Sequence, residues 1–230
     1  MTHEEIIKTS SLMIIAGSET SSSLLSGAVF LLAKNPEWLE KVYDELREAF
    51  KNENEMNFAS LSQLKVLQAV LQETFRMYPP VPTALSRCTN HNGAVVCGIH
   101  IPPNTRIGIP QYPAYRSSRN FKDPDTYAPE RFLGDPKYKD DNRAVLQPFS
   151  VGPRNCIGQV CCLTNPVHRS ELTDDYQALA WSEIRAILAR LVWNFEMKLG
   201  KGSEHWDKQR VFIVWDKPSL MISLKQRVED

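Results

Sequence analysis

The sequence predicts a mainly helical α+β fold that carries a small β-sheet. Apolar side chains recur at helical spacing through most of the first 78 residues and again over residues 179–195. Between these regions, short apolar runs alternate with turns rich in proline and asparagine, which is typical of strands and loops. No internal repeat divides the 230 residues, so one medium domain, or one piece of a larger one, is expected.

The first three helices follow from this pattern in order. A long helix is expected over residues 1–33, and Asn35 and Pro36 suit the cap and the first turn of the next helix. A third helix is expected over residues 60–78. The prolines that begin at Pro79 end it, because proline cannot continue the helical hydrogen-bond ladder.

The remaining elements are shorter, apart from one helix. An irregular but packed coil is expected over residues 112–134, which are rich in proline, aspartate and arginine. A last helix is expected over residues 179–195. Strands are expected at 94–96, 99–101, 106–109, 211–215 and 220–224.

Composition excludes some classes of partner. The 27 Lys and Arg balance the 27 Asp and Glu, so the formal net charge is zero. Proteins that bind nucleic acid through a large basic surface carry a clear positive excess, and we therefore expect no nucleic-acid partner. The hydrophobic fraction of 42% is enough to build a core.

The five cysteines are an odd number in a chain in which we find no signal peptide. A reducing, intracellular compartment and a special role for one thiol are therefore favoured over a disulfide framework. No stretch of about 18 consecutive apolar residues occurs, and Glu19 interrupts the most apolar segment, residues 12–32. We therefore expect no membrane span, and we interpret this segment as a helix buried in a protein core.

The strongest motif is Phe149-Ser-Val-Gly152-Pro-Arg154-Asn-Cys156-Ile-Gly158. It resembles the haem-binding signature of cytochromes P450 at all of that signature's fixed positions. The resemblance implies that Cys156 is the axial thiolate ligand of a haem iron, whose electron density favours O–O cleavage. The alternative is a free cysteine buried in a loop of glycine and proline.

The chemistry of such a ligand explains the neighbouring residue types. The loop has to be tight and shielded, and Gly152 can adopt turn geometry that a side chain would block. By the resemblance, Phe149 would cover the thiolate side of the ring and Arg154 would pair with a haem propionate. Gly158 would let the following helix approach the porphyrin, and the N-terminus of that helix would stabilise the Cys156 thiolate.

A second motif, Ala16-Gly17-Ser-Glu19-Thr20, resembles the oxygen-binding motif of the long central helix of the same family. Gly17 would let dioxygen and the ring lie close to the backbone. Thr20 and Glu19 would relay protons, a general-acid role, and the Thr20 hydroxyl can bond to a carbonyl one turn earlier. Ile15 and Ala16 would line the substrate. Without its context, this motif would be ordinary polar helix surface.

A third motif, Glu73-Thr-Phe-Arg76, resembles the E-x-x-R of the family, whose members share one helix face. In the family a further arginine joins them from a Pro-Glu-Arg-Phe segment, here Arg131, and the buried cluster has a structural role. Arg87 follows the proline-rich turn at the place of a propionate-binding arginine. Thr83 and Ala84 lie in the segment that lines the substrate pocket.

The resemblance covers nearly the whole chain and implies the C-terminal part of the cytochrome P450 fold, with the N-terminal half missing. The implied cofactor is haem. Electrons would come from NADPH, not bound directly, through a flavoprotein reductase, and the substrate would be a small apolar organic molecule. Residues 132–136 and 146–150 are similar to fungal secondary-metabolism members. Full-length relatives are commonly anchored in the endoplasmic reticulum, whereas this chain alone would be cytoplasmic.

One segment departs from the family pattern. The helix that should follow the cysteine loop directly begins at Leu179, after an interruption over residues 160–177. This interruption has the character of a translated intron, because Val160-Cys161 can be encoded as a splice donor and Gln177 as an acceptor. A genuine insertion is the alternative.

The interruption also leaves two rival functions open. Cys156, Cys161, Cys162 and His168 could be taken for a zinc site, although their spacing fits no common zinc module. The chain could also be a catalytically inactive haem-binding fragment or splice product, because half of the haem pocket would be open to water.

Overall fold

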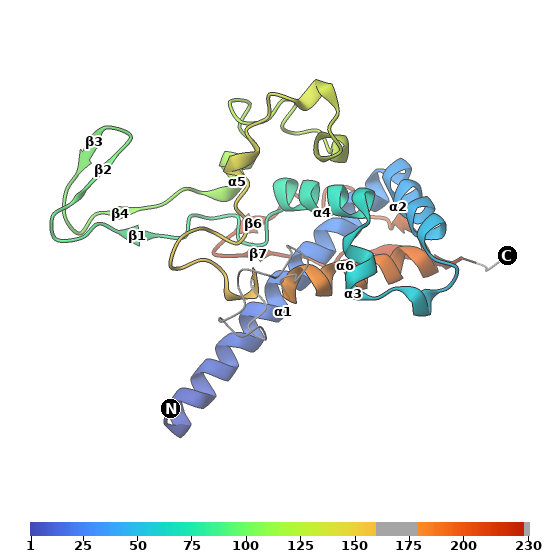
Figure 1. The fold of residues 1–230 in the computed structure, drawn as a ribbon, viewed down its shortest axis with the longest axis horizontal. Helices are drawn as coiled ribbons and strands as arrows, with labels where there is room; N and C mark the ends of the chain where they lie inside the picture. Colours follow the sequence, from blue (N-terminus) through green and yellow to red (C-terminus); the bar gives the residue numbers. More distant parts are fainter. Residues whose placement is uncertain (160–178, 228–230) are drawn as a thin grey trace.

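The computed structural model describes residues 1–159 and 179–227 (Figure 1). The expected interruption at 160–177 lies outside the described residues. Helices of the N-terminal third and the last helix form the main body, and two thin strand pairs extend from it as an arm.

The first helix, α1 (His3–Lys34), begins at Thr2, whose side chain and that of Glu5 form a capping box. Its first half projects away from the body (Figure 1). The expectation of a fully buried helix over 12–32 is therefore wrong, because Leu12, Met13, Ile14 and Ile15 are each exposed by 58% to 69%. Burial begins at Ser21, where α1 meets the other helices.

By length and mean hydropathy, α1 alone among the described helices could cross a membrane. Its most apolar window has a mean hydropathy of 1.2, and 39% of that window is buried inside the fold. The core helix of a soluble protein meets the same criterion, so the absence of a membrane span stays a prediction.

Helix α2 (Pro36–Ala49) starts at the expected proline, but not with the expected cap. The amide of Asn35 donates to the carbonyl oxygen of Leu31 at 2.7 Å, so this side chain serves the C-terminus of α1 instead. Burial of Trp38, Leu39, Val42 and Leu46 turns the apolar face of α2 toward the core.

The helix expected over 60–78 is two helices, α3 (Phe58–Ser62) and α4 (Lys65–Met77). Leu64 between them is extended, with ψ of 111°. The carboxylate of Glu45 on α2 accepts from the backbone N–H of Val66 at 2.7 Å and of Leu67 at 2.9 Å. A cap from another helix therefore stabilises a second helix start that no local residue provides.

The arm consists of two antiparallel pairs. The strand pair β2 (Ala94–Val96) and β3 (Ile99–Ile101) forms a hairpin, and β1 (Arg87–Cys88) pairs with β4 (Arg106–Ile107) at its base. Figure 1 shows this arm extending to the left of the helices. The expected strands at 94–96 and 99–101 match, and that at 106–109 ends two residues earlier.

A long coil joins the arm to the cysteine loop. It is irregular as expected, but it contains a short helix and several 3-10 turns: α5 (Gln111–Tyr115), η2 (Pro129–Phe132), η3 (Pro136–Tyr138) and η4 (Arg143–Val145). A further 3-10 turn, η1 (Glu53–Glu55), precedes α3. These turns fold the coil back over α4 (Figure 1).

The C-terminal region differs most from expectation. Helix α6 (Leu179–Asn194) passes directly into β5 (Phe195–Leu199), which pairs with β8 (Ile222–Gln226). The run at 211–215 is a hairpin of β6 (Arg210–Val211) and β7 (Trp215–Asp216) instead of one strand. Within the described residues, four two-stranded sheets replace the single small sheet expected.

Two apolar clusters hold these elements together. The larger one joins the second half of α1 to α2, α4 and α6. The smaller one is an aromatic cluster at the C-terminal ends of α1 and α4, made of Phe30, Leu31, Met77, Tyr78, Trp206 and Trp215. Gly27 lets α1 approach it, because a Cβ there would lie 2.5 Å from Cδ1 of Tyr78.

Candidate functional site

The cysteine loop, residues 149–158, is closed by hydrogen bonds within its own backbone. The N–H of Cys156 donates to the carbonyl oxygen of Phe149 at 2.8 Å, and that of Asn155 donates to Gly152 at 3.0 Å. Gly152 has a φ of +82°, which a side chain would disfavour. Ser150 adopts a φ of +61° without that freedom, so the surrounding contacts hold the loop in a strained form.

Phe149 anchors the loop to the helices. Its ring lies 5.5 Å from that of Phe75 on α4 and 6.0 Å from that of Trp181 on α6. The side chain therefore packs inward against the larger apolar cluster. This contact fixes one end of the loop, and it explains why an aromatic residue suits the position even before any ligand is considered.

The Cys156 thiol is exposed, which has two consequences. The alternative of a free cysteine buried in the loop is wrong. The expected shielding is also not provided by the loop itself, because the residues around Cys156 are exposed as well, including Val151 at 62% and Ile157 at 65%. The thiol is therefore accessible to a ligand.

Where a helix was expected directly after Cys156, the described residues form the 3-10 turn η5 (Ile157–Gln159). Gly158 does allow a close approach, since a Cβ there would lie 3.6 Å from Cys156 Sγ and 3.9 Å from Ala180 Cβ. The start of α6 therefore lies beside the thiol despite the intervening residues.

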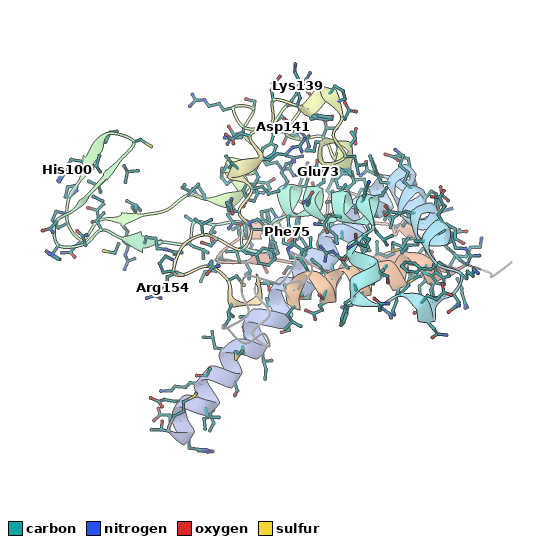
Figure 2. All side chains as sticks on the ribbon, in the orientation of Figure 1. Glu73, Phe75, His100, Lys139, Asp141 and Arg154 are labelled. Carbon is teal, nitrogen blue, oxygen red and sulfur yellow. The ribbon has the colours of Figure 1, made fainter. Side chains whose placement is uncertain are left out.

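Arg87 reaches the cysteine loop from β1. Its Nη2 donates to Ser150 Oγ at 3.3 Å, and its Nη1 donates to the carbonyl oxygens of Leu85 and Ser86 at 3.2 Å. Arg154 is exposed and projects outward from the loop (Figure 2). Arg87 contacts the cysteine loop and Arg154 lies within it, and the guanidinium group of either residue can bind a carboxylate.

The second motif lies where α1 leaves the body. Thr20 Oγ1 donates to the Ala16 carbonyl oxygen at 2.7 Å, which is the one-turn bond that the sequence suggested. Gly17 faces open space, because a Cβ there would meet no atom within 4 Å. Ile15 is 64% exposed. Glu19 has a different environment, because its carboxylate forms an ion pair with Lys217 from the C-terminal segment.

The third motif forms a buried ionic cluster, which we call the Glu73 cluster: Glu73, Arg76, Arg131 and Asp141. Arg76 Nε and Nη2 donate to the two carboxylate oxygens of Glu73 at 2.7 and 2.8 Å. Arg131 lies 3.2 Å from Glu73 and 2.6 Å from Asp141. Figure 2 labels Glu73 on α4 and Asp141 in the coil that folds over it.

Electrostatics explains how this cluster tolerates burial. Glu73, Arg76 and Arg131 are each 0% exposed. Burial alone would lower the pKa of Arg131, but the carboxylates of Glu73 and Asp141 raise it above its ordinary value. Arg76 also donates to the carbonyl oxygens of Tyr115, Pro124 and Thr126, so the cluster fixes the coil that leads to the cysteine loop.

Sequence reasoning missed Asp141, Lys217 and the tip of the β6–β7 hairpin. Thr83 Oγ1 donates to the carbonyl oxygen of Ile213 at 3.3 Å at that tip, where Ile213 is 70% exposed. Ala84 pairs with Pro110 through an isolated bridge. The proposed substrate-lining residues Thr83 and Ala84 therefore belong to a surface that includes the hairpin, which no local pattern indicated.

The donor set fits a haem better than a bare metal ion. A single soft thiol, two nearby guanidinium groups and exposed apolar side chains suit a large apolar ring with carboxylate arms. No group of three His, Cys, Asp or Glu able to chelate a metal occurs among residues 1–159 and 179–227. Cys161, Cys162 and His168 of the zinc alternative lie outside the described residues.

Two small cavities lie away from these motifs. One, of about 200 Å³, is enclosed by the C-terminal ends of α1 and α4, beside Lys34 and Tyr78. The other, of about 250 Å³, lies in the coil around Phe121. Neither of these two cavities is lined by the cysteine loop.

Comparisons with known proteins all match the same family. A sequence model described as Cytochrome P450 matches residues 1–161, which ends just inside the expected interruption. The chain is 40% identical over 227 residues to "Cytochrome P450 monooxygenase astA" of Talaromyces wortmannii, covering 99% of this chain and 42% of that protein. It is 41% identical over 231 residues to "Averantin hydroxylase" of Dothistroma septosporum, covering 99% and 41%.

A third relative is "Fusicoccadiene 8-ol C-16-hydroxylase" of Phomopsis amygdali, 39% identical over 227 residues and covering 99% of this chain and 40% of that protein. The chain thus spans about two fifths of the length of the curated relatives it matches.

Proposed function

The chain belongs to the cytochrome P450 family, as its cysteine loop predicted, and we propose that it functions as a haem-dependent monooxygenase. The reaction would insert one atom of dioxygen into a small apolar organic substrate, in fungal secondary metabolism. The expected likeness to fungal members of the family is confirmed by the named relatives. The activity, substrate and partners of the whole protein are part of the proposal.

The single observation that carries this proposal is the cysteine loop. Its backbone bond from Cys156 to Phe149 leaves the thiol exposed on a strained, anchored turn, with Arg87 bonded to the same loop. A haem bound there would supply the activation of dioxygen, and the Cys156 sulfur would hold its iron. Arg87 and Arg154 would each bind a carboxylate arm and so orient the ring.

The other site residues of the protein would each have a separate role. Thr20 and Glu19 would carry protons to the reacting oxygen as general acids. Gly17, with open space beside it, would let the ring and dioxygen lie against α1. The Glu73 cluster would hold the coil and the cysteine loop in place. Ile15, Ala16, Thr83 and Ala84 would contact the substrate.

The family resemblance supports a redox partner as well. NADPH would not bind directly, and a flavoprotein reductase would deliver its electrons. The full-length form would lie at the endoplasmic reticulum membrane and this chain alone in the cytoplasm.

The direct test is haem content and turnover of the complete protein. Purified with haem supplied, it should contain one haem per chain. With reductase, NADPH and isotopically labelled dioxygen, it should place one labelled atom in the product. Averantin and fusicoccadiene 8-ol, which appear in the names of two relatives, are the first substrates to try. A complete protein that holds no haem contradicts the proposal.

A second candidate function is supported by the exposure of the same site. In the 230-residue chain, Leu12 to Ile15 and the Cys156 loop all face solvent. A ring bound there would be open to water on one side, so this chain by itself would bind haem without turnover. Hydroxylation by the purified 230-residue chain, given reductase and NADPH, would exclude this candidate. Sequencing the transcript would decide whether codons 160–177 are an intron.

A further inference from the structure

Lys217 makes a contact that the motifs do not account for. Its ammonium group donates to Glu19 Oε1 and, at 2.6 Å, to Ser23 Oγ. Glu19 and Ser23 are one turn apart on α1, and Ser23 is 0% exposed. The side chain of Lys217 itself is 21% exposed, against 44% for Glu19. A cation from the C-terminal segment therefore sits on the face of α1 that carries the acid of the second motif.

The position of Lys217 is fixed by the aromatic cluster. The indole N–H of Trp215 donates to the Pro79 carbonyl oxygen at 2.7 Å, and that of Trp206 donates to Pro218 at 2.9 Å. These two bonds hold the chain on either side of Lys217. Because the backbone on both sides of Lys217 is already held, forming the ion pair requires no further ordering of the backbone.

The same cluster fixes α1 relative to Lys217. Trp215 stacks on Tyr78 with ring centroids 4.7 Å apart and planes at 11°. Tyr78 in turn lies against Gly27 of α1, where a Cβ would come within 2.5 Å of its ring. One continuous set of contacts therefore runs from α1 through Tyr78 and Trp215 to the residue two positions before Lys217.

The acid and the threonine of the motif have separate partners. Thr20 bonds within α1 to Ala16, beside the open space at Gly17. Glu19 pairs with Lys217 of the C-terminal segment, and it also accepts from Ser23 Oγ on α1 at 3.5 Å. A positioned general acid contributes about 10²–10⁴-fold to a rate, and that contribution depends on the carboxylate returning to one place in each turnover.

We propose that Lys217 is a positioning residue that holds the carboxylate of Glu19 in the orientation from which it serves proton delivery. This rests on the proposed function. Productive turnover converts substrate, dioxygen, NADPH and a proton into hydroxylated product, water and NADP⁺. The unproductive branch converts dioxygen, NADPH and a proton into hydrogen peroxide and NADP⁺, and a misplaced acid favours it.

The test uses the complete haem-loaded protein and the variants Lys217→Met, Lys217→Arg and Lys208→Met. Lys217→Met keeps the aliphatic stem and removes the charge, and we expect product per NADPH to fall about tenfold while peroxide per NADPH rises. Lys217→Arg should retain most of the coupling. Lys208, exposed and outside the ion pairs of the described residues, is the matched control, and its variant should behave as the unmodified protein.

A second readout needs neither haem nor turnover. In a double-mutant cycle of Lys217→Met and Glu19→Gln, the unfolding equilibrium should show coupling by a factor of about two to five, as for a partly exposed ion pair. A cycle without coupling overturns the proposal, as does product per NADPH in Lys217→Met equal to that in Lys208→Met. Absence of haem from the unmodified protein overturns the proposed function instead, and the cycle then still reports on the pair.

Discussion

Replacing Arg131 with methionine tests the Glu73 cluster most sharply. Arg131 is 0% exposed and neutralises two carboxylates, Glu73 at 3.2 Å and Asp141 at 2.6 Å. In the variant, Glu73 keeps both bonds from Arg76 and one from the backbone N–H of Ala128 at 2.8 Å. The loss therefore falls mainly on Asp141.

Among the described residues, Asp141 would keep a single N–H donor, that of Lys122 at 2.7 Å, while its side chain is 1% exposed. Removing one partner of a buried pair costs about 3–5 kcal/mol, because the remaining charge is buried without compensation. Since a whole domain is stabilised by only about 5–15 kcal/mol, the urea midpoint of Arg131→Met should drop by a large fraction. Urea titration of the complete protein, followed by tryptophan fluorescence, measures it.

Two further variants separate this reason from others. Arg210 pairs with Asp216 on the surface, with side chains 81% and 44% exposed, so Arg210→Met should cost about 0–1 kcal/mol. Adding Asp141→Asn to Arg131→Met removes the stranded charge and should restore about 1–3 kcal/mol. Equal costs for Arg131→Met and Arg210→Met, or no recovery in the double variant, would refute the reasoning.

Four other variants test packing, capping and titration. Gly27→Ala should destabilise the fold by about 1–3 kcal/mol, because the new Cβ would meet Tyr78. Gly17→Ala, with open space around it, should instead gain up to about 1 kcal/mol of helix stability and yet impair haem binding. A thermal scan and a haem titration of both variants distinguish the two effects. Glu45→Ala should cost about 0.5–2 kcal/mol, since it removes the acceptor of two N–H groups at the start of α4, and an unchanged urea midpoint would contradict that. Burial raises the pKa of Tyr115 to about 12, so the folded state keeps the phenol proton that the unfolded chain loses near pH 10. The contribution of Tyr115 to folding stability is therefore full below about pH 10 and is lost as the pH rises to about 12. Tyr115→Phe should make the free energy of unfolding less steeply dependent on pH in that window.

Local sequence signals predicted the elements whose causes are local. The helical spacing along α1 and the proline at the start of α2 both lie within a few residues of what they determine. The break between α3 and α4 does not, because its cap comes from Glu45, 21 residues before Val66. Strand β5 follows α6 without any breaker, and its pairing with β8 is a tertiary contact, so the periodic pattern continued the helix by one residue.

The same distinction applies to the site. Glu73 and Arg76 are one helical turn apart, so their pairing could be predicted from spacing. Asp141 carries no motif, and only the folded coil brings it to Arg131. Lys217 lies 198 residues from Glu19, and nothing in its neighbourhood indicates that contact. The family resemblance implied roles for Glu73, Arg76 and Glu19, whereas Asp141 and Lys217 were found only in the structure.

Whether the Cys156 sulfur binds the haem iron can be read from the absorption spectrum of the complete protein, reduced and bound to carbon monoxide, compared with that of Cys156→Ala. A thiolate ligand on the haem iron gives a characteristic band, which we expect in the unmodified protein and not in the variant. If the band is missing from the unmodified protein, or persists in Cys156→Ala, the sulfur of Cys156 is not the ligand and the account is wrong.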